Sequence, residues 1–114
     1  MDVFNVVSSQ LKNIFCASEE QINKIIQNEL NLVAQSKTKY ALSGFNNKYY
    51  SEELYPFNSV IYCNYLYWLS RILFENNEKL LADKVYYLNK MLNSVDLFYE
   101  IQLPEIWSCE HPLG

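Results

Sequence analysis

The stretch from Asn58 to Asn93, NSVIYCNYLYWLSRILFENNEKLLADKVYYLNKMLN, decides the fold. Apolar residues recur at three- and four-residue spacing on both sides of the Asn76-Asn77 pair, which is the period of an amphipathic helix. Asn58 can cap a first helix that ends near Glu75. Asn77 can cap a second helix, from about residue 78 to Asn93. The pattern therefore predicts two antiparallel helices joined by a short turn.

Both helices have a clear set of positions that we expect to face inward. These are Val60, Ile61, Leu66, Leu69, Ile72 and Leu73, followed by Leu80, Leu81, Val85, Leu88, Met91 and Leu92. The first helix lies in an apolar run, Phe57 to Phe74, that is about long enough to cross a bilayer. Polar residues such as Asn64 and Arg71 interrupt the run, which favours the central helix of a soluble domain over a membrane span.

The residues before this hairpin also have a helical pattern. Phe4, Val7 and Leu11 recur on one face of a predicted helix over residues 3–15. Ser18 and Gln21 fit a capping box, which predicts a second helix from Ser18 to about residue 42. Residues 44–57 contain glycine, asparagine and proline, which is typical of a connecting loop.

The rhythm changes after Asn93. Apolar residues then stand at every second position, which is the period of a strand: Val95, Leu97, Tyr99, Ile101 and Leu103. We therefore predict an all-α fold: a bundle of about four helices over residues 1–93, with a short extended segment over 94–114. Because the sequence ends soon after this alternation begins, we expect it to be cut ahead of further structure.

Composition excludes several classes of function. The chain has 114 residues, half of them hydrophobic, and a formal net charge of -4. This balance argues against nucleic acid, whose phosphates require clustered Lys and Arg. Cys16, Cys63 and Cys109 show no paired spacing, which favours free thiols, a cytoplasmic protein and no metal site.

Aromatic residues gather on the two helices of the hairpin. They are Tyr62, Tyr65, Tyr67, Trp68, Tyr86 and Tyr87. Rings of this kind pack cores and oligomer surfaces, so we expect them to form core contacts and, in part, subunit contacts.

The run from Leu73 to Ala82, LFENNEKLLA, followed by Val95-Asp96, resembles the end of the helical domain in bacterial serine acetyltransferases. That family has a Leu-aromatic helix end, a polar turn, a Leu-Ala helix and then Val-Asp-Ile-His-Pro. In the same register, Leu103 falls on the first Ile-Gly repeat of the family. The final EHPLG, from Glu110 to Gly114, falls on its Asp-His-x-x-Gly motif.

The resemblance implies a helical domain followed by a left-handed parallel β-helix that transfers acetyl from acetyl-coenzyme A to L-serine or a similar small hydroxyl acceptor, a step of cysteine synthesis. By position, His111 resembles the general base, Asp96 the carboxylate that orients it, and Glu110 a residue that contacts the acceptor. The helical domain of the family joins subunits, so self-association is expected, and these 114 residues alone are expected to be inactive.

The sequence departs from the family's pattern at several positions, which puts serine itself in doubt as the acceptor. The Ile-His-Pro of the family is replaced by Leu97-Phe98-Tyr99, and Glu110 stands where the family has Asp. Two other functions stay open: a stand-alone helical protein-protein interaction domain, in which residues 95–114 are a tail, and a hexapeptide acyltransferase for sugars.

Overall fold

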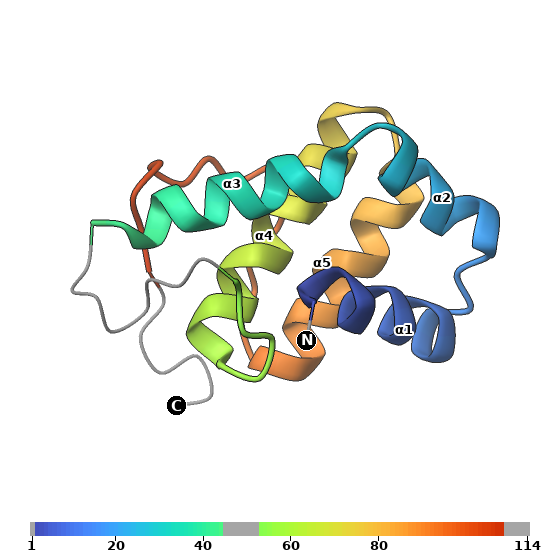
Figure 1. Cartoon of the computed structure of the whole chain (residues 1–114), viewed down its shortest axis with the longest axis horizontal. Helices are drawn as coiled ribbons and strands as arrows, with labels where there is room; N and C mark the ends of the chain where they lie inside the picture. The colour runs from blue at the N-terminus through green and yellow to red at the C-terminus, as the bar shows by residue number, and fades with distance from the viewer. Residues whose placement is uncertain (1, 45–52, 109–114) are drawn as a thin grey trace.

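Five helices form the part of the chain that the structure, a computed structural model, describes: residues 2–44 and 53–108. They are α1 (Val3–Phe15), α2 (Glu19–Gln27), α3 (Leu30–Leu42), α4 (Ser59–Glu75) and α5 (Lys79–Asn93) (Figure 1). The predicted all-α class is confirmed, and the helices number five within these ranges where about four were expected.

α4 is the central helix. It packs against α5 on one side and α3 on the other, while α1 contacts α5 and α2 contacts α3 (Figure 1). The expected cap is present, because the Oδ1 of Asn58 accepts hydrogen bonds from the amides of Val60 (3.0 Å) and Ile61 (3.4 Å). All six inward positions predicted for this helix are buried, so the reading of α4 is confirmed.

The turn between α4 and α5 differs from the prediction in one respect. Asn77 has a left-handed backbone, with φ of 62°, and it ends α4 without capping α5. The amide of Glu78 donates to the carbonyl of Leu73 (2.9 Å) and that of Asn77 to Phe74 (3.1 Å), the bonds of a Schellman motif. Glu78 precedes α5 and makes no side-chain cap, so the predicted Asn77 cap is wrong.

The single helix predicted from Ser18 to about residue 42 is also wrong, since it is divided into α2 and α3. The capping box at its start is present, with Ser18 and Gln21 exchanging hydrogen bonds of 3.0 and 3.1 Å. Glu29 adopts a left-handed backbone with φ of 56°, which ends the regular hydrogen bonding of α2 and changes the helix phase. Ile22 and Ile25 are buried before this break and Leu30 after it.

Three positions of α5 predicted to face inward are exposed: Leu80, Met91 and Leu92. α5 faces α4 through one stripe, which consists of Leu81, Ala82, Val85, Leu88, Asn89 and Asn93. Apolar residues beside that stripe have no neighbour in the described chain that covers them, so a helical period alone overestimates the buried face.

Residues 94–108, hereafter the C-terminal segment, contain neither helix nor strand. The chain leaves α5 at Ser94, turns at residues 98–101, where the amide of Ile101 donates to the carbonyl of Phe98 (2.9 Å), and runs along α4. Tyr99 and Trp107 are buried. The alternating apolar pattern does not form a strand within residues 94–108, and a β-helix beyond them stays a prediction.

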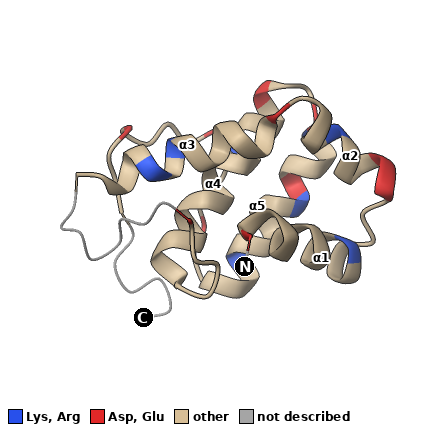
Figure 2. Ribbon diagram, viewed as in Figure 1, with Lys and Arg blue, Asp and Glu red and all other residues tan. Residues whose placement is uncertain are grey.

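Within the described residues, no helix has both the length and the apolar character needed to cross a membrane. Figure 2 shows Lys and Arg distributed over several helices and interspersed with Asp and Glu. The apolar run predicted to be a central helix is α4, which has 17 residues and lies inside the bundle.

Candidate functional site

Asp96 stands at the start of the C-terminal segment, just beyond α5. The α5 helix ends because Ser94 has a left-handed backbone, with φ of 54°. The hydroxyl of Tyr86 donates to the Oδ1 of Asp96 (2.5 Å), and the Nζ of Lys90 lies 4.0 Å from its Oδ2. The hydrogen bond to Asp96 raises the pKa of Tyr86 above its ordinary value, because ionisation would place two negative charges together.

The side chain of Asp96 is 67% exposed, so its carboxylate is accessible to a group on another part of the chain. The two other residues assigned by resemblance, Glu110 and His111, lie outside the described residues. The structure thus places one of the three predicted site residues and leaves their mutual geometry a prediction.

A polar stripe on α4 holds the C-terminal segment in place. The side-chain amide of Asn64 donates to the carbonyl of Trp107 (3.0 Å), and the guanidinium of Arg71 donates to the carbonyl of Tyr99 (2.9 Å). Between them, the hydroxyl of Tyr67 donates to the carbonyl of Ile101. The spacing of three and four residues places these side chains on one face of the helix. Asn64 and Arg71, which interrupt the apolar run in the sequence, therefore donate hydrogen bonds to backbone carbonyls of the C-terminal segment.

Aromatic packing strengthens the same contact. The rings of Tyr67 and Trp107 meet edge to face with centroids 5.4 Å apart, and Phe74 lies 4.8 Å from Tyr99. Phe98 packs against Tyr99 at 4.2 Å and against Tyr86 at 5.3 Å. Such pairs add to the burial of the rings themselves, so the C-terminal segment is a packed layer of the domain.

Tyr99 also links this layer to α5. Its hydroxyl donates to the Oδ1 of Asp83 (2.5 Å), and Lys79 donates to the Oδ2 of the same carboxylate (3.0 Å). Burial alone would raise the pKa of Asp83, but the hydrogen bonds from Tyr99 and Lys79 outweigh it and lower that pKa. Burial and then the bond to Asp83 raise the pKa of Tyr99.

Most of the aromatic side chains expected at core or subunit contacts are buried within the helical bundle. Tyr62, Tyr65, Tyr67 and Trp68 are buried, whereas Tyr87 is exposed. The hydroxyl of Tyr65 donates to the Oδ1 of Asn31 on α3 (2.6 Å). The four α4 rings therefore form core contacts, as the sequence indicated for aromatic residues in general.

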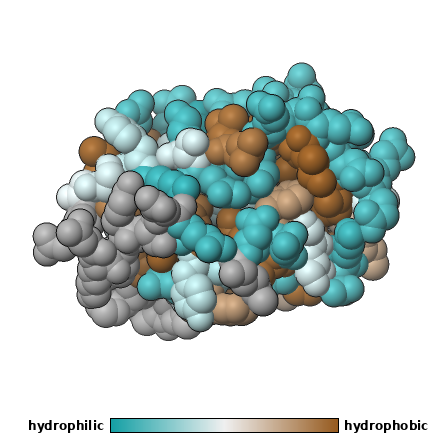
Figure 3. All heavy atoms as spheres, viewed as in Figure 1, coloured by the Kyte–Doolittle hydropathy of each residue, from teal (hydrophilic) through white to brown (hydrophobic). Residues whose placement is uncertain are grey.

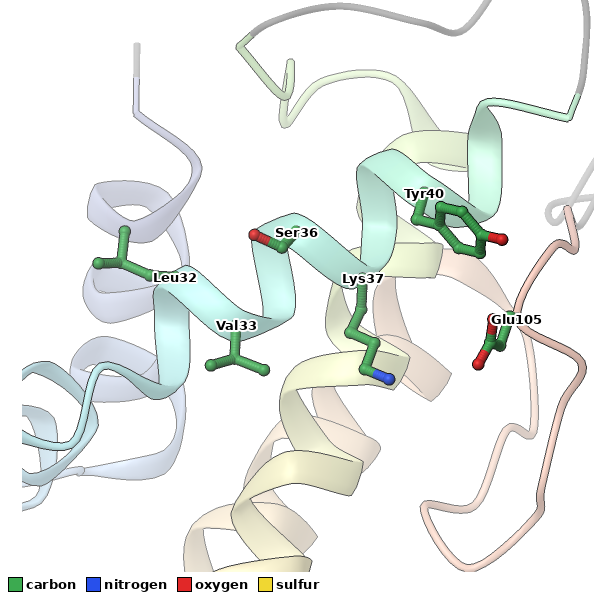
Figure 4. Close-up of a pocket in the computed structure, with 6 residues that line it drawn as sticks. All are labelled: Leu32, Val33, Ser36, Lys37, Tyr40 and Glu105. Atoms are coloured by element: carbon green, nitrogen blue, oxygen red, sulfur yellow. The ribbon is translucent and has the colours of Figure 1, made fainter.

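A hollow of about 370 Å³ lies on the outer side of α3. Leu32, Val33, Ser36, Lys37 and Tyr40 of α3 line it, and Glu105 borders it from the C-terminal segment (Figure 4). Its walls are mainly apolar, with one positive and one negative side chain. We call it the α3 hollow.

The sequence did not indicate the α3 hollow, although a signal was present. α3 buries the small side chains of Ala34, Thr38 and Ala41 along its middle and leaves larger apolar ones outside. Small residues at a helical spacing of four and three allow the close approach of a neighbouring helix, here α4. In residues 2–44 and 53–108, no group of His, Cys, Asp and Glu is arranged to hold a metal.

No protein-family model, curated protein or solved structure matches this chain.

Proposed function

We propose that this chain is the helical part of a serine acetyltransferase-like enzyme, which transfers acetyl from acetyl-coenzyme A to L-serine or a similar small hydroxyl acceptor. One observation supports it above others: α4 fixes the chain downstream of Asp96 through Asn64, Tyr67 and Arg71. A helical domain that precedes a catalytic region must deliver the chain in a defined position. A loose tail would lack these bonds.

In the proposed reaction, His111 takes the proton of the acceptor hydroxyl while the oxygen of that hydroxyl attacks the thioester carbonyl. The carbon-sulfur bond then breaks, and the proton passes from the imidazolium to the leaving thiolate. The products are the O-acetylated acceptor and free coenzyme A. Asp96 would hold the imidazole in the required tautomer, and Glu110 would contact the acceptor.

The geometry of Asp96 is compatible with that role. Tyr86 donates to one carboxylate oxygen, and Lys90 lies at 4.0 Å from the other, which leaves Oδ2 able to accept a stronger bond. An orienting carboxylate needs such a support, because an aspartate fixed by a neighbour fixes the histidine in turn.

The test is thiol release from acetyl-coenzyme A with L-serine, measured on the full-length product of the gene beside the 114-residue chain. We expect serine-dependent turnover in the full-length protein, a loss of about 10²- to 10⁴-fold in His111→Ala, and no turnover in the short chain. Glu100→Gln, an exposed position of the C-terminal segment, is the control and should leave the rate unchanged.

Turnover with a sugar hydroxyl and none with serine would move the assignment to an acyltransferase for sugars. No turnover with any small hydroxyl acceptor would overturn the transferase proposal. Asp96→Asn tests the orienting role separately: kcat should fall and the pH profile of kcat should change, because the tautomer of His111 would no longer be fixed.

A second function, that of a helical protein-protein interaction domain, is favoured by a different observation. Large apolar side chains reach the surface over α3, where Figure 3 shows hydrophobic residues between hydrophilic ones. A helix that exposes several large apolar residues on one side presents a contact surface. The two functions are compatible, since the helical domain of the resembling family joins subunits.

A further inference from the structure

The outer face of α3 carries three large apolar side chains without cover in the described chain. Leu32 is 56% exposed, Val33 43% and Tyr40 53%. They line the α3 hollow together with Lys37 and Ser36 (Figure 4). Single exposed apolar residues are common, but three around one hollow on one helix indicate a surface that another protein covers.

Two opposite charges border this surface. Figure 4 shows Lys37 projecting from α3 on the side of the hollow where Glu105 lies on the C-terminal segment. Within the described residues, neither side chain takes part in an ion pair. The Nζ of Lys37 lies over the ring of Trp68, 5.4 Å from its centroid, in a cation-π contact. The α3 hollow is therefore neutral as a whole while containing one cation and one anion.

We propose that the α3 hollow is an isologous interface that binds the same surface of a second copy of this chain. In a two-fold interface each patch meets itself, so a patch with one Lys and one Glu can form the same ion pair twice, Lys37 of one protomer with Glu105 of the other. A strongly acidic or basic partner would gain one charge contact and suffer one repulsion. The apolar side chains of Leu32, Val33 and Tyr40 would supply the buried centre.

This inference rests on the subunit-joining part of the proposed function and is independent of acetyl transfer. Loss of the interface leaves His111 in place, and loss of His111 leaves the α3 hollow in place. Oligomeric mass and thiol release therefore report separately on the two proposals.

The decisive experiment measures the mass of the 114-residue chain by sedimentation equilibrium for three charge combinations. Wild type should form dimers. Lys37→Glu and Glu105→Lys should each weaken the dimer by about 100-fold, because each places two like charges opposite each other in both contacts. An equimolar mixture of the two variants should restore the dimer. In the mixed dimer the two substituted side chains meet as one ion pair of reversed sense, and the unchanged Lys37 and Glu105 meet as the other.

Two further variants separate loss of the interface from loss of folding. Val33→Asp should produce a monomer with the helical circular dichroism of wild type, because the change is at the surface. Leu80→Asp replaces an exposed apolar residue on α5 and should leave the dimer intact. A monomeric wild type, a dimer that survives Val33→Asp, or a mixture of the charge variants that stays monomeric would each overturn the proposal.

Discussion

α3 and α4 lie side by side and yet relate to the rest of the molecule in opposite ways. α4 buries 13 of its 17 residues, whereas α3 buries 5 of its 13. The large side chains of α4 are enclosed by α3, α5 and the C-terminal segment. α3 buries Leu30 and Leu42 near its ends and small side chains along its middle, while Leu32, Val33 and Tyr40 are exposed.

The difference separates two kinds of apolar surface. Side chains on α4 stabilise the fold, since each is removed from water within the chain. The exposed side chains on the outer face of α3 contribute little to the fold of one chain, because they stay in contact with water. Substitutions in α4 should therefore act on unfolding, and those in the α3 hollow on association.

The largest expected effect is alkaline unfolding, which starts from α4. Burial raises the pKa of Tyr62 and Tyr65 well above the ordinary value of about 10, and the neighbouring charges of Tyr62 and Asp2 add to the shift of Tyr65. Above about pH 10 the tyrosines of the unfolded chain lose their protons, whereas Tyr62 and Tyr65 of the folded chain keep theirs. The stability of the folded chain is therefore fully present below about pH 10 and is lost as the pH rises toward the raised pKa values. In a titration to high pH, the absorbance of tyrosinate should increase over the same pH range in which the helical circular dichroism signal decreases.

Tyr65→Phe checks this assignment, because removal of a buried ionisable hydroxyl should move the alkaline midpoint upward. Asn31 loses a hydrogen-bond donor in this variant, so each midpoint is compared with the stability of the same protein at neutral pH. Reversible ionisation of all tyrosines near the ordinary pKa of about 10 with unchanged helicity would contradict the burial argument.

The same leucine truncation on the two helices should give very different losses. Leu69→Ala removes a fully buried side chain from α4 and should lower the free energy of unfolding by about 3 kcal/mol, as cavities in well-packed cores do. Leu32→Ala removes an exposed one from α3 and should cost less than about 0.5 kcal/mol. Urea denaturation of the monomer measures both, and equal losses would refute the division between core and contact surface.

A smaller effect is expected where α4 meets the C-terminal segment. Tyr67→Phe deletes the hydroxyl that donates to the carbonyl of Ile101 and accepts from the amide of Leu103, and it should cost about 1 to 2 kcal/mol. Hydrogen exchange of the Leu103 amide should accelerate more than that of the α5 amides. In Tyr65→Phe, which deletes a hydroxyl bonded to α3, this local acceleration should be absent.

The α4–α5 hairpin could be predicted because several independent signals agree in it. The apolar period, the Asn58 cap and the Asn76-Asn77 break all indicate the same boundaries. The course of the C-terminal segment could not be predicted, since it depends on bonds from Asn64 and Arg71 to backbone carbonyls, which leave no period in the sequence. The role of Asp96 is a prediction that rests on resemblance alone, and its hydrogen bond with Tyr86 could be found only from the three-dimensional structure.

The break between α2 and α3 was missed for a different physical reason. A continuous helix places Glu29 on the same face as Ile22 and Ile25, and a charge at a buried position was the available warning. A left-handed residue other than glycine is uncommon, so local sequence favours the continuous helix. The change of phase accompanies the burial of Leu30 and Ala34 in the bundle, and such tertiary packing overrides local helix propensity.

Glu29→Gly should have the smallest effect on the free energy of unfolding. The sign of that effect distinguishes two separate helices, α2 and α3, from one continuous helix. At a left-handed position, glycine removes the steric cost of a Cβ, about 1 kcal/mol, which exceeds or offsets the entropy that glycine adds to the unfolded chain. We expect a free energy of unfolding that is unchanged or higher by up to about 1 kcal/mol. In a continuous helix from residue 19 to 42, the same glycine would lower it by about 1 kcal/mol. Asn23→Gly, at an exposed interior position of α2, is the control and should lower the free energy of unfolding by up to about 0.5 kcal/mol. A decrease in Glu29→Gly of equal or greater size would restore the single helix.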